Sequence, residues 1–150
     1  MTGGKNPRIL LVEDNPVDVQ ILKHALSSSD VPHDVDVADD GETALNLLIE
    51  KAELEQKSLP QLVILDLNLP KKSGLEVLRE IKTHRQLRRI PVVVMSSSRS
   101  ERDVNSAYDN GANLYVRKPN DLDSVEQLAR AIAQAWLKFG VLSGSSSFGF

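Results

Sequence analysis

Short and almost continuous hydrophobic runs recur along the chain, separated by longer segments with a different periodicity. Runs without polar alternation are typical of strands that are covered on both faces, as in parallel sheets. Five such runs predict strands at residues 8–12, 35–38, 62–65, 92–95 and 114–116. None of the runs approaches the roughly 18 apolar residues that a membrane-spanning helix needs.

The segments between these runs repeat hydrophobic residues every three or four positions, which predicts amphipathic helices. The predicted helices cover residues 16–27, 41 to about 51, 73–84, 100–110 and 121 to about 139. Pro16 stands at a helix start, where proline is tolerated. Ser73 and Glu76 form the Ser-x-x-Glu pattern of a capping box, and Gly111 ends the fourth helix.

The regular alternation of strand and helix predicts an α/β fold with right-handed crossovers and a parallel sheet. The simplest arrangement is a doubly wound five-stranded sheet of order 2-1-3-4-5, the flavodoxin-like order, with five helices. We expect one domain over residues 8–139. Residues 1–7 and the glycine- and serine-rich residues 140–150 are predicted to be flexible.

Composition narrows the classes of function. The 150 residues suit one domain, and 41% hydrophobic residues provide a core. A net charge of -3 gives no indication of binding to nucleic acid or to an anionic membrane. The absence of cysteine excludes thiol chemistry and thiolate metal sites. The first residues lack the apolar core of a signal peptide, so we expect a cytoplasmic protein.

Acidic residues follow two of the predicted strands directly. Glu13 and Asp14 follow strand 8–12, and Asp66 follows strand 62–65. These two strands border the switch point of the predicted sheet, where ligands of open α/β sheets bind. Three carboxylates held together would repel one another, whereas a hard divalent cation such as Mg²⁺ relieves the repulsion. The sequence therefore predicts a divalent-metal site, the alternative being acids that merely cap strand ends in water.

Polar residues also follow the other two strands of this half of the sheet. Ser96 follows strand 92–95, and its hydroxyl would face the same pocket. Lys118 comes shortly after strand 114–116 and could direct a cation toward the acids. Taken singly, Ser96 could also be an ordinary loop serine, and Lys118 could be a solvated loop lysine.

In their joint order and spacing, several short motifs resemble the receiver domain of two-component response regulators over about residues 8–139. The matching motifs are Leu-Val-Glu-Asp-Asn at 11–15, Asp-Gly at 40–41, Leu-Asp-Leu-Asn-Leu-Pro at 65–70, Val-Val-Met-Ser at 93–96, Gly-Ala-Asn at 111–113 and Tyr-Val-Arg-Lys-Pro at 115–119. The resemblance implies a signalling switch that accepts a phosphoryl group from a histidine kinase. It implies self-phosphorylation and slow autodephosphorylation, with no other enzymatic turnover.

The resemblance also implies a role for each matching position. Asp66 would be the phosphoacceptor that forms an aspartyl phosphate. Mg²⁺ (or Mn²⁺) would be held by Asp14 directly, by Glu13 through water, by Asp66, and by the backbone carbonyl of Asn68. The phosphoryl group would be contacted by Lys118 and Ser96. Tyr115 would be the switch aromatic that changes rotamer as Ser96 moves.

The late part of the last predicted helix carries Trp136, Leu137 and Phe139, where the helix is expected to run beyond the sheet. Exposed aromatic residues of this kind mark interfaces. We expect a homodimer through the fourth helix, the fifth strand and the last helix. Output would then pass to a downstream protein target or a phosphotransfer protein, with no role for nucleic acid or membrane.

Shorter stretches at residues 67–74, 89–94 and 135–137 resemble the stand-alone receivers that are paired with bacterial phytochromes. This finer resemblance implies a light-sensing histidine kinase as the partner.

Two other classes of function fit the sequence less well. A phosphohydrolase with an acid nucleophile would need a second acid two residues after Asp66, where this chain has Asn68. A flavodoxin-like cofactor carrier would need a phosphate-binding loop after the first strand, where Glu13 and Asp14 would repel phosphate.

Overall fold

The computed structural model describes residues 6–54 and 58–140 and contains one parallel sheet. Its strands are β1 (Arg8–Val12), β2 (Asp34–Ala38), β3 (Leu62–Leu65), β4 (Val92–Ser96) and β5 (Leu114–Arg117). The strand order is β2-β1-β3-β4-β5, which confirms the predicted doubly wound arrangement. The predicted flexible segments fall mostly outside the described residues.

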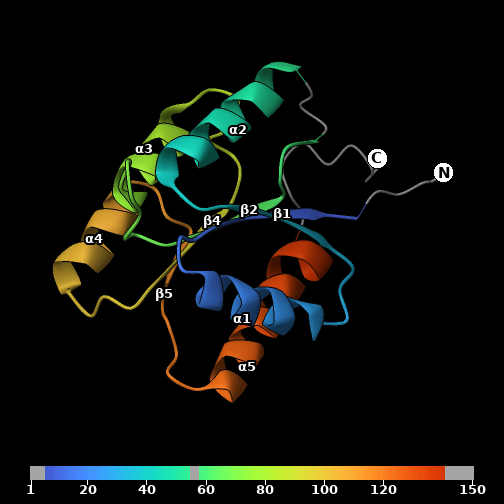
Figure 1. Ribbon diagram of the computed structural model, residues 1–150. Helices are drawn as coiled ribbons and strands as arrows, with labels where there is room; N and C mark the ends of the chain where they lie inside the picture. Colours follow the sequence, from blue (N-terminus) through green and yellow to red (C-terminus); the bar gives the residue numbers. More distant parts are fainter. Residues whose placement is uncertain (1–5, 55–57, 141–150) are drawn as a thin grey trace.

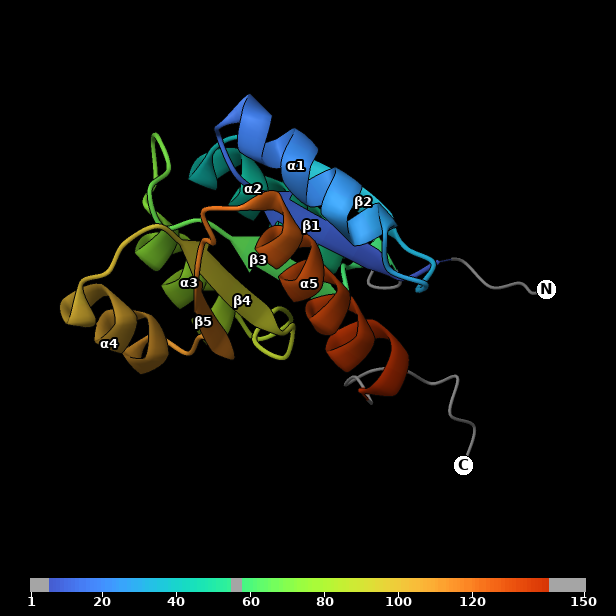
Figure 2. The same ribbon diagram turned by 90° about the horizontal axis from the view of Figure 1, so that it is seen from below.

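Helices cover both faces of the sheet (Figure 1). They are α1 (Pro16–Ser27), α2 (Gly41–Leu54), α3 (Gly74–Thr83), α4 (Glu101–Asp109) and α5 (Leu122–Ala133). One face carries α1 and α5, which lie side by side in Figures 1 and 2, and the other carries α2, α3 and α4. In the described ranges, 6–54 and 58–140, no helix combines the length and hydropathy needed to span a membrane.

The core consists of two hydrophobic clusters, one on each face of the sheet. The alternation of side chains along each strand divides β1 between them: Leu10 and Val12 face α2 and α3, whereas Ile9 and Leu11 face α1 and α5. Every residue of β3 and β4 is buried, as expected for strands covered on both faces.

Side-chain caps fix the starts of helices on both faces of the sheet. The Asn15 side chain accepts hydrogen bonds from backbone amides of α1. Ser73 and Glu76 form the predicted capping box of α3. Ser100 and Asp121 accept from the backbones of α4 and α5. These caps satisfy helix-end amides that would otherwise lack partners, and they set where each helix leaves the strand before it.

The end of the last helix differs from the prediction of one α-helix to about residue 139. The α-helical winding of α5 ends at Ala133, and Gln134–Phe139 follow as a π-helix. With this winding, Trp136 and Leu137 are half-buried against the α1–α5 core, although we expected them to be exposed. Phe139 is 71% exposed, as expected.

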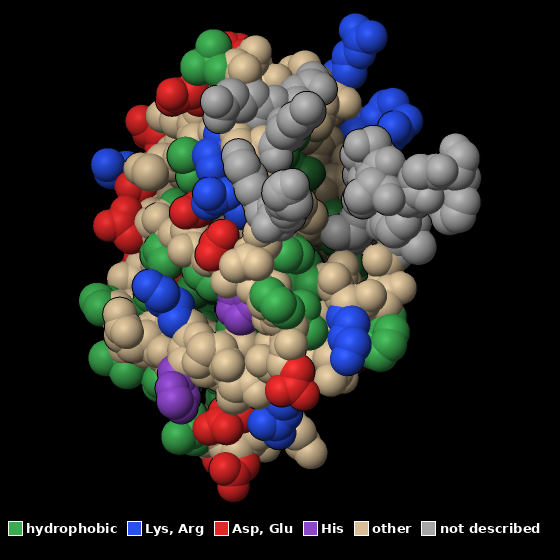
Figure 3. Space-filling view, turned by 90° about the vertical axis from the view of Figure 1, so that its right-hand side faces the viewer, with side chains coloured by type: hydrophobic (Ala, Val, Ile, Leu, Met, Phe, Trp, Pro, Cys, Tyr) green, Lys and Arg blue, Asp and Glu red, His purple; other side chains and the backbone are tan. Residues whose placement is uncertain are grey.

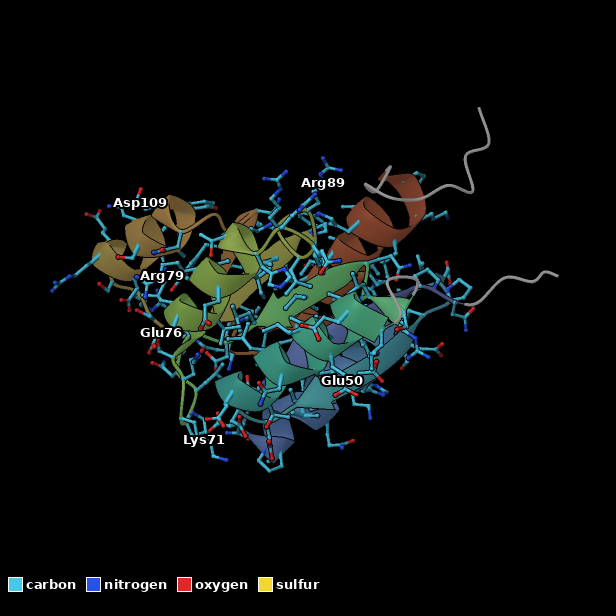
Figure 4. The ribbon with its side chains drawn as sticks, turned by 90° about the horizontal axis from the view of Figure 1, so that it is seen from above. Glu50, Lys71, Glu76, Arg79, Arg89 and Asp109 are labelled. Carbon is cyan, nitrogen blue, oxygen red and sulfur yellow. The ribbon has the colours of Figure 1, made fainter. Side chains whose placement is uncertain are left out.

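The outer surface carries charges of both signs. On the α2–α3–α4 layer, Glu76, Arg79 and Asp109 are exposed at the rim of the helices (Figure 4). The face shown in Figure 3 likewise intersperses acidic, basic and hydrophobic side chains. This mixture agrees with the nearly balanced charge of the sequence.

Candidate functional site

The register of the central strands brings the acidic residues together. Val12 of β1 pairs with Leu65 of β3, so the residues that follow them leave the sheet side by side. The Asp66 amide donates to the carbonyl of Val12 at 3.0 Å. Glu13, Asp14 and Asp66 each offer a carboxylate oxygen within 4.8 Å of the others. The sequence prediction of one acidic cluster at the switch point is therefore confirmed.

The three acids differ in exposure. Glu13 is 2% exposed and Asp66 is 7% exposed, whereas Asp14 faces solvent. Burial in low dielectric disfavours the charged carboxylate and raises the pKa of Glu13 above its ordinary value. The charge of Asp66 raises this pKa further, while the hydrogen bond from Lys118 opposes both effects. The cluster thus combines two buried acids with one acid that faces solvent.

Lys118 reaches into the acidic cluster from the end of β5, as predicted. Its amide donates to the Ser96 carbonyl at 2.9 Å, which holds it beside β4. Its Nζ donates to Glu13 Oε1 at 2.7 Å, and it lies 3.4 Å from Asp66 Oδ2. Burial alone would lower the pKa of Lys118, but its three acidic neighbours raise this pKa above its ordinary value.

The third acidic neighbour of Lys118 is Asp18, which the sequence reasoning missed. Asp18 lies in the first turn of α1, and its Oδ2 accepts from Lys118 Nζ at 3.1 Å. Asp18 and Lys118 both line a pocket of about 310 Å³ between α1 and the start of α5. The available signal was its position in the first turn of the helix that follows β1, which places it near the edge of the sheet where Glu13 and Asp14 lie.

The donor set fits a hard divalent cation. Three carboxylates within 4.8 Å of one another supply oxygen ligands, and one of the three is exposed to water. Asn68 is exposed, and its amide donates to Asp66 Oδ1 at 3.3 Å, so the loop after β3 folds back over the acid. When bound, such a cation would neutralise charge that develops on a phosphoryl group.

Ser96 and Tyr115 both contact Ser98. Ser96 is fully buried, and its Oγ accepts from the Ser98 amide at 3.1 Å. Tyr115 Oη donates to the Ser98 carbonyl at 3.1 Å. Ser98 Oγ donates to Asp103 Oδ2 in the first turn of α4 at 2.5 Å. A movement of Ser96 would therefore reach Tyr115 and α4 through one residue, which the sequence reasoning did not single out.

Gly74 packs against the backbone of Asp66 and Leu67. Its amide donates to the Leu67 carbonyl at 2.9 Å, which holds the start of α3 against the chain that carries Asp66. A Cβ at position 74 would lie 2.5 Å from Leu67 Cα and closer still to the Asp66 carbonyl oxygen. Only glycine allows this close approach, so α3 and the segment of Asp66 are positioned together.

Comparison with known proteins agrees with this geometry. Residues 9–130 match the family described as the response regulator receiver domain. The chain is 39% identical over 140 residues to the response regulator Rcp1 of Synechocystis sp., covering 92% of this chain and 95% of Rcp1. It is 39% identical over 129 residues to a probable methanogenesis regulatory protein, FilR2, of Methanothrix harundinacea, covering 86% of this chain and 83% of that protein.

Solved structures of response regulators also resemble this chain. The phosphorylated cyanobacterial phytochrome response regulator RcpA superposes with a TM-score of 0.85 and 42% identity, covering 93% of this chain and all of RcpA. The Mn²⁺-bound form of Rcp1 superposes with a TM-score of 0.83 and 38% identity, covering 92% and 99%. The bacteriophytochrome response regulator AtBRR gives a TM-score of 0.71 and 38% identity, covering 93% and 99%.

Proposed function

Because the chain belongs to the response regulator receiver domain family, we propose that Asp66 accepts a phosphoryl group from a histidine kinase in a reaction that requires Mg²⁺ or Mn²⁺. A carboxylate oxygen of Asp66 attacks phosphorus as the phosphorus–nitrogen bond of the phosphohistidine breaks. The imidazole leaves with the electron pair of that bond, and an aspartyl phosphate results. The observation that carries this proposal is the position of Asp66, buried in an acidic cluster with an ammonium 3.4 Å away.

Each neighbour of Asp66 has a part in this proposal. Glu13 and Asp14 hold the cation together with Asp66, and the Asn68 carbonyl completes its protein ligands. Lys118 contacts a phosphoryl oxygen, which adds positive charge where phosphoryl transfer needs it. Asn68 stands where an acid-nucleophile phosphohydrolase would need its second acid, so we propose no turnover beyond self-phosphorylation and slow autodephosphorylation.

The signal then leaves through Ser96 and Tyr115. The phosphoryl group carries a charge of about -2 and attracts the Ser96 hydroxyl. In the unphosphorylated structure this hydroxyl accepts a hydrogen bond from the Ser98 amide. Drawing Ser96 inward pulls on Ser98, whose carbonyl holds Tyr115. We therefore propose that phosphorylation rearranges the face formed by α4, β5 and α5.

The test is labelling of the purified protein by acetyl phosphate with and without Mg²⁺. Wild type should gain one phosphoryl group only when the cation is present, and Asp66→Asn should gain none. Asp39→Asn is the matched control, since Asp39 is an exposed acid directly after β2 at the same edge of the sheet. Equal labelling of Asp66→Asn and wild type would refute the assignment.

For the kinase, we propose a phytochrome-type histidine kinase as the partner, acting in the cytoplasm. Similarity to RcpA and AtBRR, both described as phytochrome response regulators, supports this choice. Phosphotransfer to Asp66 should therefore be faster from a purified bacterial phytochrome kinase than from an unrelated histidine kinase. Equal rates from both kinases would contradict the pairing.

For output, we propose a homodimer through the α4–β5–α5 face and a downstream protein or phosphotransfer protein as target. The exposed hydrophobic residues Tyr108 on α4 and Phe139 on the π-helix support an interface there. Phe139→Glu tests the dimer better than a change of Trp136 or Leu137, because these two residues also pack on the core. Phe139→Glu should elute as a monomer where wild type elutes as a dimer, and an unchanged elution volume would remove this proposal.

A further inference from the structure

One ammonium group is shared by three carboxylates at the site. Lys118 Nζ lies 2.7 Å from Glu13 and 3.1 Å from Asp18, both closer than Asp66 at 3.4 Å. Glu13 belongs to the proposed metal set, and Asp66 is the proposed nucleophile. Asp18 belongs to neither, since it lies outside the cluster of carboxylates that could hold an ion. Its contact with Lys118 therefore has no part in the proposed function as stated so far.

We propose that Asp18 is a positioning residue that holds the Lys118 ammonium back from Asp66 in the unphosphorylated protein and thereby slows phosphorylation. This inference rests on the proposed function and concerns the regulation of the same site. Asp18 competes with the incoming phosphoryl group for Lys118. The phosphoryl group gains the ammonium as a partner only when the contact with Asp18 weakens.

The location of Asp18 suits such a competitor. Its side chain is 36% exposed, whereas that of Lys118 is 19% exposed, so the carboxylate sits at the mouth of the site and the ammonium sits within it. Asp18 also lines the pocket beside Lys118, together with the apolar side chains of Ile21 and Met95. A partly exposed ion pair is weak enough to exchange, yet it biases where a flexible lysine side chain rests.

A purely structural role for Asp18 has a different signature. An acid in the first turn of a helix stabilises that helix through its dipole, wherever the nearby lysine lies. Loss of this interaction would lower the stability of α1 and would act independently of Lys118. The two roles are therefore separated by asking whether the effect of Asp18 on phosphorylation requires Lys118.

The experiment measures the rate constant for phosphorylation by acetyl phosphate at saturating Mg²⁺. Asp18→Asn should react about two- to five-fold faster than wild type, the size expected for release of one partly exposed ion pair. Asp18→Glu keeps a carboxylate and should react at the wild-type rate. Asp39→Asn removes an exposed acid from the same edge and should also leave the rate unchanged.

A double-mutant cycle tests whether Asp18 acts on the phosphorylation rate through Lys118. In the Lys118→Gln background, Asp18→Asn should change the slower residual rate by less than about 1.5-fold, because the group it acts through is gone. An equal acceleration in both backgrounds would show a general charge effect and overturn the inference. So would an Asp18→Asn rate equal to or below that of wild type.

A second readout needs neither metal nor phosphoryl donor. Trace acetylation followed by mass spectrometry reports how readily the free amine of Lys118 forms. Asp18→Asn should be acetylated at Lys118 faster than wild type, and equal reactivity would overturn the claim that Asp18 holds this ammonium. The two proposals fail differently: an unlabelled wild type refutes the proposed function, whereas a labelled wild type with an unaltered Asp18→Asn refutes only this inference.

Discussion

Replacing Gly74 with alanine should displace Asp66 without altering any group that takes part in the chemistry. Gly74 is the first residue of α3, and the chain segment of Asp66 and Leu67 passes directly against it. The added methyl group would meet backbone atoms on the other side, which cannot rotate away as a flexible side chain could. Either α3 or the segment that carries Asp66 has to shift.

The size of the shift follows from the contact distance. The new Cβ would lie 2.5 Å from Leu67 Cα, where carbon atoms in contact are normally about 3.5–4.0 Å apart. The backbones therefore have to separate by about 1 Å. Overpacking of this kind costs about 1–3 kcal/mol, of which the better helix propensity of alanine offsets up to about 1 kcal/mol. A misplacement of about 1 Å at a reacting group costs up to about 100-fold in rate.

Gly74→Ala should accordingly phosphorylate about 10- to 100-fold more slowly with acetyl phosphate and Mg²⁺. Its free energy of unfolding, measured by urea titration, should fall by about 1–3 kcal/mol. Ser73→Ala is the matched control because it removes the N-cap of the same helix, at a cost of about 0.5–2 kcal/mol, without adding an atom against Asp66. Ser73→Ala should lose comparable stability and keep its phosphorylation rate.

Either of two outcomes would contradict this role of Gly74. If folded Gly74→Ala is phosphorylated at the wild-type rate, the contact does not position Asp66. If Ser73→Ala is slowed as much as Gly74→Ala, loss of stability rather than displacement explains the effect.

Three further predictions concern Glu13, Lys71 and Ser98. The raised pKa of Glu13 means that protons compete with Mg²⁺ at a higher pH than for an ordinary glutamate, so calorimetry should show affinity falling as the pH drops through this pKa. Glu13→Gln should bind more weakly and with a flatter pH profile, and parallel profiles would contradict the assignment. Lys71 (Figure 4) has a φ of 66°, a left-handed conformation that glycine adopts more easily than alanine. Lys71→Gly should therefore be about 1 kcal/mol more stable to urea than Lys71→Ala, and equal stability would argue against strain in this loop. Ser98→Ala removes the hydroxyl that donates to Asp103 and should increase amide hydrogen exchange across α4 several-fold, and unchanged protection would show that this bond does not hold α4.

Much of the site could be predicted because a parallel sheet converts sequence order into spatial order. Once the apolar runs before Glu13 and Asp66 are assigned to the strands that border the switch point, the two acids must leave the sheet side by side. The same reasoning places Ser96 and Lys118 at that edge. These inferences need only strand identity and direction, which hydrophobic runs indicate well.

What could not be predicted depends on side-chain geometry between elements. Asp18 faces Lys118 because of how α1 leaves β1, and no periodicity in the sequence encodes this distance. Lys71 adopts a left-handed backbone, although glycine or asparagine is the usual residue there and lysine gives no signal. The π-helical winding after Ala133 was also unforeseen, because the hydrophobic spacing of this segment fits an α-helix equally well. Trp136 in this segment packs against the core.

The charges at the site link the proposed cation to the proposed phosphoryl group. With an effective dielectric constant of 20, two carboxylates no more than 4.8 Å apart repel by at least about 3.5 kcal/mol, and an ammonium at about 3 Å attracts each by about 5.5 kcal/mol before desolvation. In the resting protein Lys118 therefore offsets the repulsion between Glu13 and Asp66. Glu13, Asp14 and Asp66 would hold the proposed cation, whose positive charge would offset the same repulsion and leave Glu13 attracting the ammonium less strongly. The Lys118 ammonium would then be available to a phosphoryl oxygen, so under the proposed function the cation and the phosphoryl group should each favour the binding of the other, by the reciprocity that couples any two linked ligands.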